Sequence, residues 1–233
     1  MPLLECRQVS KAFGQTVVLR ETSFTVEDGE HLAITGPSGA GKSTLLGLLA
    51  GLLEPTGGVI LQDGRAVSAP GSVVRPDTRG LGVLLQGLGL WPHLSVLQNV
   101  ELAIPAASGR LFPLSGWLAR RRFRRELAEK ALSDVGLSHL ARRRPQDLSG
   151  GERQRAAWAR AVAGGPRILL LDEPLTSLDP ALEEDLVRLV LEYGSQPGRT
   201  VLIVTHRHEV AARVGRKQLA LVPTSRGLAG SPP

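Results

Sequence analysis

The stretch Gly36-Pro37-Ser38-Gly39-Ala40-Gly41-Lys42-Ser43-Thr44 decides the fold, because it fits the phosphate-cradling pattern G-x-x-x-x-G-K-[S/T]. A run typical of a buried strand, residues 31–35, precedes it, and a run typical of a helix, residues 43–50, follows it. The loop's three glycines let successive backbone N–H groups point at one anion, to which the start of the helix adds its positive dipole end. The sequence therefore predicts a strand, loop and helix that bind a nucleotide polyphosphate.

The side chains at the end of this loop carry the chemistry that phosphate binding needs. Lys42 would reach the β- and γ-phosphates, and the Ser43 hydroxyl would ligate Mg²⁺. The alternative, a glycine-rich turn that merely opens a helix, does not account for the full spacing and its flanks. By itself the loop leaves kinases, GTPases and ATPases open. The residues expected to bind the nucleotide here are Gly36, Pro37, Ser38, Gly39, Ala40, Gly41, Lys42, Ser43 and Thr44.

Two motifs further along the chain narrow this choice. The first is Leu148-Ser149-Gly150-Gly151-Glu152-Arg153-Gln154-Arg155. The second, Ile168-Leu169-Leu170-Leu171-Asp172-Glu173-Pro174, is typical of a fully buried strand that ends in two carboxylates. At the end of that strand Asp172 can support the Mg²⁺ shell, while Glu173 can polarise a water molecule.

The order and spacing of these motifs resemble those of the ATP-binding-cassette (ABC) ATPases. The set is extended by Gln86 before the two motifs, and by Ser177-Leu178-Asp179-Pro180 and Thr205-His206 after them. The resemblance implies an α/β fold, a P-loop NTPase of ABC ATPase type with an antiparallel β-subdomain and a helical subdomain. ATP and Mg²⁺ are the ligands that this family uses.

The resemblance runs from about Leu3 to about Val222, so we expect a single domain over residues 1–222. Its helical subdomain is expected at roughly residues 87–160, and residues 223–233 are expected to form a flexible tail. Within the helical subdomain, four helix-breaking residues predict a loop or a broken helix: Pro105, Gly109, Pro113 and Gly116.

The composition is that of an ordinary globular protein. At 233 residues the chain is long enough for a sizeable core, and 42% of its residues are hydrophobic. Its longest nearly apolar run, from Leu45 to Leu53, falls well short of the ~20 residues that a membrane span needs, and no secretory signal is expected at the N-terminus. The single cysteine, Cys6, excludes an internal disulfide and fits a reducing cytoplasm.

Two arginine clusters lie between Gln86 and the LSGGE motif in a chain whose net charge is +6. One comprises Arg120, Arg121, Arg122, Arg124 and Arg125, and the other Arg142, Arg143 and Arg144. A solvated helical face is favoured for both, with docking on a membrane surface or protein partner as the first alternative and nucleic acid as the second. No nucleic-acid partner is expected, because only 3% of the residues are aromatic and few side chains could stack on bases.

The N-terminal region, residues 3–29, alternates apolar and polar residues in short runs that predict antiparallel β-structure. Phe13 stands where the resemblance places an aromatic residue that stacks on adenine. A flat apolar ring suits a purine face. As a lone aromatic residue, Phe13 can equally belong to the core, and the sequence leaves both possibilities open.

Gln86 follows a short apolar run, residues 81–85, that predicts a buried strand with the glutamine at its tip. A neutral amide there can contact Mg²⁺ or the attacking water without adding charge. The resemblance implies that this loop also senses a transport partner. The segment Leu90–Val100 resembles the part of solute transporters that faces a short coupling helix of the membrane subunit, and its portion Trp91–Val100 favours an importer.

Further roles follow from the resemblance. Lys42 and the loop amides would offset phosphate charge, Glu173 would act as base or position the water, and His206 would bridge the γ-phosphate and that base. Ser149, Gly150 and Gly151 would cap ATP held by a second ABC ATPase subunit, so a head-to-tail dimer is expected. Asp179 would shape the contact between the two subunits.

These inferences indicate the ATP-hydrolysing subunit of a membrane transporter, peripheral on the cytoplasmic face, whose permease subunits are separate chains. An importer of small solutes in bacteria is favoured, with a solute-binding protein as a further candidate partner. The nearest rival is an export or lipid/lipoprotein-extraction complex. A soluble ABC ATPase acting on nucleic acid or ribosomes is less favoured, because the chain has one phosphate loop, one LSGGE and no sustained heptads. The solute cannot be read from the catalytic residues.

Overall fold

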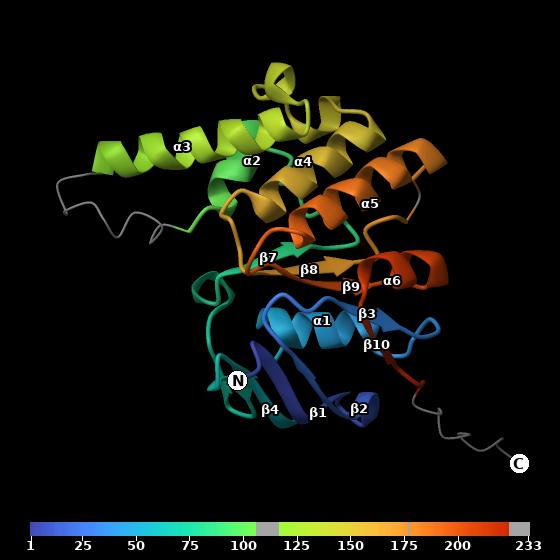
Figure 1. Ribbon diagram of the computed structural model, residues 1–233. Coiled ribbons are helices and arrows are strands. Elements are labelled where there is room, and N and C mark those ends of the chain that lie inside the picture. The colour runs from blue at the N-terminus through green and yellow to red at the C-terminus, as the bar shows by residue number, and fades with distance from the viewer. Residues whose placement is uncertain (106–116, 177, 224–233) are drawn as a thin grey trace, which may run out of the picture.

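The computed structural model describes residues 1–105, 117–176 and 178–223, which form two sheets with helices between and above them (Figure 1). Ser177, residues 106–116 of the predicted helix break, and all of the predicted tail except Pro223 lie outside the described residues. The division into one domain over residues 1–222 and a tail stays a prediction.

The first sheet is antiparallel and contains the predicted N-terminal β-structure. Its strand order is β2-β1-β4-β5-β6. The strands are β1 (Leu4–Phe13), β2 (Thr16–Val26), β4 (Gly57–Gln62), β5 (Arg65–Ala69) and β6 (Ser72–Val73). Five residues of β1 and β2 are buried, and the other residues of these strands are half-buried or exposed. The buried residues are Leu4, Cys6, Val9, Leu19 and Val26.

The second sheet is parallel, with the strand order β10-β3-β9-β8-β7. Its strands are β3 (Leu32–Thr35), β7 (Leu81–Leu84), β8 (Ile168–Asp172), β9 (Thr200–Val204) and β10 (Lys217–Ala220). Strands β8 and β9 are buried along their whole length, as continuous apolar runs require. Because parallel strands end at one edge, the residues after β3, β7, β8 and β9 meet there.

The helices divide between the two faces of the parallel sheet. Helix α1 (Lys42–Ala50) lies between the two sheets, and α4 and α5 cover the opposite face, with α2 and α3 packed beyond (Figure 1). Two hydrophobic cores result, one around α1 and one beneath the other helices. The remaining elements are α2 (Val96–Ala103), α3 (Trp117–Asp134), α4 (Gly150–Val162), α5 (Pro180–Gly194), α6 (His208–Val214) and the short 3-10 helices Pro76–Thr78, Ser138–Leu140 and Pro145–Asp147.

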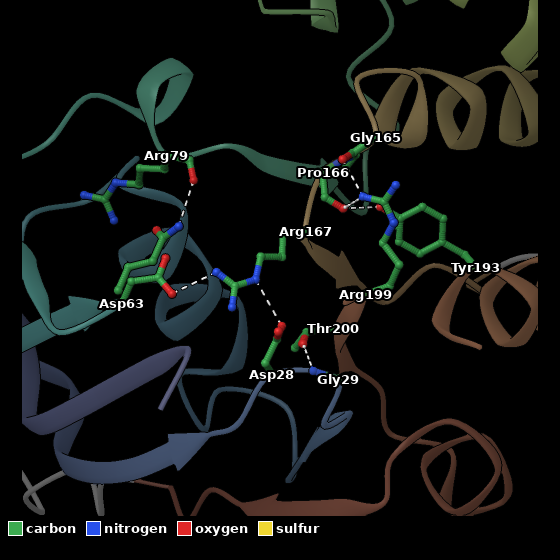
Figure 2. Close-up of polar contacts among 11 residues, drawn as sticks. Asp28, Gly29, Asp63, Arg79, Gly165, Pro166, Arg167, Tyr193, Arg199 and Thr200 are labelled. Atoms are coloured by element: carbon green, nitrogen blue, oxygen red, sulfur yellow. Dashed lines mark hydrogen bonds and ion pairs between the residues drawn. The ribbon is translucent and has the colours of Figure 1, made fainter. Parts of the chain in front are cut away.

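Arg167, which directly precedes β8, connects the two sheets. Its Nε donates to Oδ1 of Asp28 at 3.0 Å, and its Nη1 donates to Oδ1 of Asp63 at 2.8 Å (Figure 2). Asp28 lies before β3 and Asp63 lies in the β4–β5 turn. One arginine therefore fixes the antiparallel sheet relative to the end of the parallel sheet that is opposite the strands' carboxyl edge.

The first arginine cluster takes up two kinds of position on α3. Arg122 and Arg125 form ion pairs with Glu126 and Glu129, one helical turn away and largely exposed, as the solvated-face interpretation predicts. Arg124 instead is partly buried and donates to the backbone oxygen of Glu101 on α2. The solvated face thus accounts for part of the cluster.

Candidate nucleotide site

The phosphate loop lies at the carboxyl edge of the parallel sheet, between β3 and α1. A Cβ atom on Gly36 would lie 2.5 Å from the carbonyl oxygen of Leu221, and one on Gly41 would lie 2.7 Å from that of Val18. Both glycines have positive φ, 143° and 89°. Only glycine allows this backbone conformation at so close an approach of neighbouring chain, which explains these two positions of the motif.

Lys42, the first residue of α1, folds back over the loop. Its side chain is 8% exposed, and its Nζ donates to the carbonyl oxygens of Gly36 at 2.8 Å and of Pro37 at 3.0 Å. The ammonium group is therefore held inside the curl of backbone at the positive end of α1. Loop and lysine together place positive charge where an anion would bind.

Asp172 ends β8 and accepts a hydrogen bond of 3.0 Å at Oδ1 from the Ser43 hydroxyl. Burial raises the pKa of this carboxyl; the bond from Ser43 opposes that shift, Glu173 adds to it, and Lys42 weakly opposes it. A buried carboxylate that is costly to charge gains most from a cation. Carboxylate and hydroxyl oxygens are ligands that Mg²⁺ prefers, usually together with substrate phosphates, so these residues fit the ion.

Glu173 and His206 meet at the ends of adjacent strands. His206 Nδ1 donates to Oε2 of Glu173 at 2.8 Å, and the Glu173 backbone N–H donates to the carbonyl oxygen of Val204 at 3.0 Å. Glu173 has φ of 48°, a conformation that non-glycine residues adopt at a cost and that occurs at functional sites. The turn after β8 thus aims the two neighbouring carboxylates, Asp172 and Glu173, at different partners.

Gln86 lies two residues beyond β7 and is exposed. The register pairs Leu84 with Leu171, so the residues after β7 lie beside the residues after β8. The predicted buried strand is two residues shorter than expected, and Gln86 belongs to the following loop. Gln86 therefore stands at the same sheet edge as Asp172 and Glu173.

The LSGGE motif forms a separate group with Asp179. Ser149 caps α4 and forms a reciprocal capping box with Glu152. Asp179 caps α5 by accepting from the backbone N–H groups of Ala181 and Leu182. A surface hollow of about 340 Å³ is lined by Ser149, Gly150, Gly151, Arg155, Leu178, Asp179 and Leu182. No residue of the phosphate loop is among those that line it.

Comparison with known protein families found one family whose model covers most of these motifs. The family described as ABC transporter matches residues 19–176, which is more than half of the chain. This chain belongs to the ABC transporter family. The matched range contains the phosphate loop, Gln86, the LSGGE motif, Asp172 and Glu173, while Asp179 and His206 lie beyond it.

Curated relatives of this ABC protein are named as import ATP-binding proteins. The spermidine/putrescine import ATP-binding protein PotA of Nitrosomonas eutropha is 36% identical over 217 residues, which are 93% of this chain and 56% of the relative. The protein of the same name from Chromobacterium violaceum is 38% identical over 206 residues, which are 88% and 53%. The chain thus spans about half the length of the curated relatives it matches.

Solved structures show the same ABC cassette fold. The dimeric structure of MJ0796, a bacterial ABC transporter cassette, is 30% identical with a TM-score of 0.78 and covers 96% of this chain and 97% of that one. The dimeric post-hydrolysis state of MJ0796 bound to ADP and Pi is 31% identical with a TM-score of 0.77 and covers 94% of each chain.

Across residues 1–105, 117–176 and 178–223, every helix is too short or too polar to cross a membrane.

Phe13 of this ABC protein ends β1 and is 50% exposed, so the alternative that it belongs to the core is wrong. The Lys11 ammonium lies 4.9 Å from its ring centroid. The β1–β2 hairpin that carries Phe13 continues to Val18, whose carbonyl oxygen approaches Gly41. The Phe13 ring is therefore exposed, on a hairpin whose second strand approaches the phosphate loop at Val18.

Arg160 is a site residue that the sequence did not reveal. From α4 its guanidinium donates to the carbonyl oxygens of Gly89 and, at 2.7 Å, of Leu88, and burial lowers its pKa. Both acceptors have positive φ and lie just after Gln86. One signal in the sequence could have revealed it. Arg160 lies four residues after Ala156 and three before Ala163, both of which are buried, and this helical spacing places the arginine on the inner side of α4.

Proposed function

We propose that this chain is the ATP-hydrolysing subunit of a bacterial importer that acts through separate membrane-spanning subunits. One observation carries the ATPase assignment. Two hydrogen bonds, from Ser43 to Asp172 and from His206 to Glu173, bring the phosphate loop and the ends of β8 and β9 to one edge of the sheet. The names of the relatives support the import direction.

The nucleotide would lie along the phosphate loop. The N–H groups of Gly36 and of residues 38–44, together with the Lys42 ammonium, would hold the phosphates, after Lys42 exchanges its present carbonyl acceptors for phosphate oxygens. The exposed ring of Phe13 would stack on the adenine. Ser43, Asp172 and Gln86 would hold Mg²⁺, which when bound offsets the charge on the phosphates.

Hydrolysis requires a water molecule aimed at the γ-phosphorus. Glu173 is the group placed to orient that water or accept its proton, because its carboxylate lies at the sheet edge and is oriented by His206. His206 donates through Nδ1, which leaves Nε2 as the ring nitrogen that can meet the γ-phosphate. Removal of either side chain would affect the chemical step more than nucleotide binding.

A head-to-tail dimer would complete each site. Ser149, Gly150 and Gly151 share a hollow with Asp179 that the phosphate loop does not line, so we infer that they serve ATP bound to a second ABC ATPase subunit. The exposed start of α4 offers N–H groups and a positive dipole end for that ATP. The dimeric cassette structures support this arrangement.

The membrane partners are part of the proposal. Permease subunits would contact the loop after Gln86 and the segment Trp91–Val100, which Asn99 organises through hydrogen bonds to both backbone groups of Trp91. The chain would then lie on the cytoplasmic face of the membrane, with a solute-binding protein delivering the solute.

The variant Glu173→Gln tests the ATPase assignment. It should bind ATP with unchanged affinity and accumulate as an ATP-dependent dimer, because the glutamine removes the base but keeps the side chain's size. The matched control is Glu192→Gln, at an exposed position on α5. Size-exclusion chromatography with ATP and a phosphate-release assay give the two readouts. A Glu173→Gln chain that remains monomeric and hydrolyses ATP at the unaltered rate would refute the assignment.

A pull-down of the Glu173→Gln chain from detergent-solubilised native membranes with ATP tests the transporter assignment. Mass spectrometry should identify a polytopic membrane protein, and an accompanying solute-binding protein would support import. Recovery of ribosomes or DNA-bound complexes without a membrane protein would contradict this assignment and favour the soluble alternative.

A further inference from the structure

Arg207, the residue after His206, forms an ion pair with Glu183 on α5. Its Nη1 donates to Oε2 of Glu183. The two side chains are 37% and 18% exposed, so the pair is partly withdrawn from solvent and less screened than a surface pair. The pair joins the loop that carries His206 to a helix from another part of the chain.

Arg207, the member of the pair next to His206, lies in a short loop that several contacts hold in place. Thr205 is 2% exposed, and its N–H donates to the carbonyl oxygen of Ile34 at 3.2 Å. The Arg207 backbone N–H donates to the Thr205 hydroxyl at 3.1 Å. His206 thus has a fixed residue on one side and Arg207 on the other. The direction of its exposed ring therefore depends on where Arg207 is held.

At its other end, the pair reaches the group formed by Asp179 and the LSGGE motif. Glu183 lies in the first turn of α5, and its N–H donates to the carbonyl oxygen of Asp179 at 3.0 Å. Asp179 caps this helix and lines the same hollow as Ser149. A shift of the start of α5 would therefore move Glu183, and through the ion pair it would move Arg207.

Another ion pair, between α5 and α6, allows an experiment to distinguish this role from simple helix packing. Arg213 and Glu184 form two hydrogen bonds, of 2.6 and 2.7 Å, with side chains 45% and 64% exposed. This pair connects α5 to α6 itself, whereas Arg207 lies in the loop just before α6. The chain therefore contains a matched control, because only the Arg207–Glu183 pair adjoins a proposed catalytic residue.

We propose that Arg207 and Glu183 are positioning residues that hold His206 against Glu173 and connect it to the dimer-facing start of α5. This inference rests on the proposed function. Glu183 fixes the position of the Arg207 guanidinium, and the guanidinium in turn orients the loop that carries His206. Contact of Asp179 with a second subunit would shift the start of α5, and with it Glu183 and Arg207. Loss of the pair affects the catalytic step, because His206 is mispositioned while the phosphate loop is unchanged.

Charge reversal of the purified full chain tests the proposal. Arg207→Glu and Glu183→Arg should each lower kcat for MgATP hydrolysis about tenfold or more, with KM within about twofold, and the double reversal should recover kcat to within about threefold of the unaltered chain. Glu184→Arg, Arg213→Glu and their double reversal are the controls, and all three should keep kcat within about twofold. Thermal unfolding of every variant separates loss of folding from loss of catalysis.

Three results would overturn the proposal. The first is an equal loss of kcat from the Arg213–Glu184 reversals, and the second is a double Arg207–Glu183 reversal no better than the single ones. The third is a higher KM with unchanged kcat. If a single reversal unfolds the chain, Arg207→Lys and Glu183→Gln replace it, and kcat unchanged in both would also overturn the proposal. An inactive unaltered chain would instead refute the proposed ATPase function, and this inference with it.

Discussion

The hydroxyl of Ser43 donates to Oδ1 of Asp172 at 3.0 Å, across 129 positions of sequence. The bond connects the start of α1 to the end of β8, so it fixes the phosphate loop against the strand that ends in Asp172 and leads into Glu173. It also partly opposes the rise in the pKa of Asp172 that burial causes. The same two oxygen atoms are those proposed to meet Mg²⁺.

Ser43→Ala should therefore weaken the Mg²⁺-dependent part of nucleotide binding. Loss of one ligand and of the bond to Asp172 should lower ATP affinity in Mg²⁺ about tenfold or more, while affinity in EDTA changes less than threefold, because the loop amides remain. Calorimetric titration with ATP, with and without Mg²⁺, provides the measurement. Ser43→Thr keeps the hydroxyl and should bind like the unaltered chain. Equal losses of affinity in both conditions would contradict the assignment of Ser43 to Mg²⁺.

Arg79 is a structural residue whose loss should destabilise the fold. It is 4% exposed, and burial lowers its pKa. Its guanidinium donates to the carbonyl oxygens of Val74, Leu49 and Val67 and to the hydroxyl of Ser68, at 2.7 to 2.9 Å. Arg79→Met would leave several of these buried acceptors unpaired, so we expect a loss of about 2–4 kcal/mol in the free energy of unfolding.

Urea denaturation measures that loss. Arg75→Met, which removes an exposed arginine paired with Asp77 in the same turn, is the control and should cost less than about 0.5 kcal/mol. If Arg79→Met cost no more than this control, the hydrogen bonds of the buried guanidinium would contribute nothing net to stability.

Local patterns in the sequence predicted most of the strands that surround the site. The apolar runs at residues 168–172 and 200–204 are buried strands, because a strand covered on both faces needs a continuous apolar sequence. The strand order β10-β3-β9-β8-β7 and the burial of Arg79 were beyond reach. Both depend on which distant segments meet, and a single sequence contains no local signal for that.

The site residues also divide into those that local sequence predicts and those that depend on a distant partner. Lys42, Ser43, Asp172, Glu173 and His206 were recognisable because each stands in or beside a short motif at the end of a strand. Arg160 and Arg207 were missed, since each acts through a partner on another element. An arginine in a helix or a loop looks like a surface residue until its acceptors are placed beside it.

Arg160 should hold the loop after Gln86 in place. Its two bonds constrain consecutive residues with positive φ, Leu88 and Gly89, whose own N–H groups donate within the loop to Leu85 and Gly87. Arg160→Met should speed hydrogen exchange of the Leu88 and Gly89 amides about tenfold or more, while the amides of β8 exchange as before. Arg188→Met, on the exposed face of α5, is the control. Unchanged exchange in the loop would show that other contacts fix it.

His31 should make stability depend on pH on the acid side. Burial lowers the pKa of this imidazole below 6.5, with Arg216 adding to the shift, and a backbone bond to Gly194 opposes it. Its Nδ1 accepts a hydrogen bond of 3.2 Å from the Val201 N–H, which requires an unprotonated nitrogen. Below pH 6.5 the unfolded chain takes up a proton that folded His31 resists. The free energy of unfolding therefore decreases as the pH is lowered below 6.5, and above pH 6.5 it does not depend on this group.

Urea denaturation at pH 7.5, 6.5 and 5.5 measures this effect. The midpoint should decline more steeply for the unaltered chain than for His31→Asn, whereas His139→Asn, at an exposed position, should keep the full decline. Equal slopes for the unaltered chain and His31→Asn would show that protonation of His31 costs the folded state nothing.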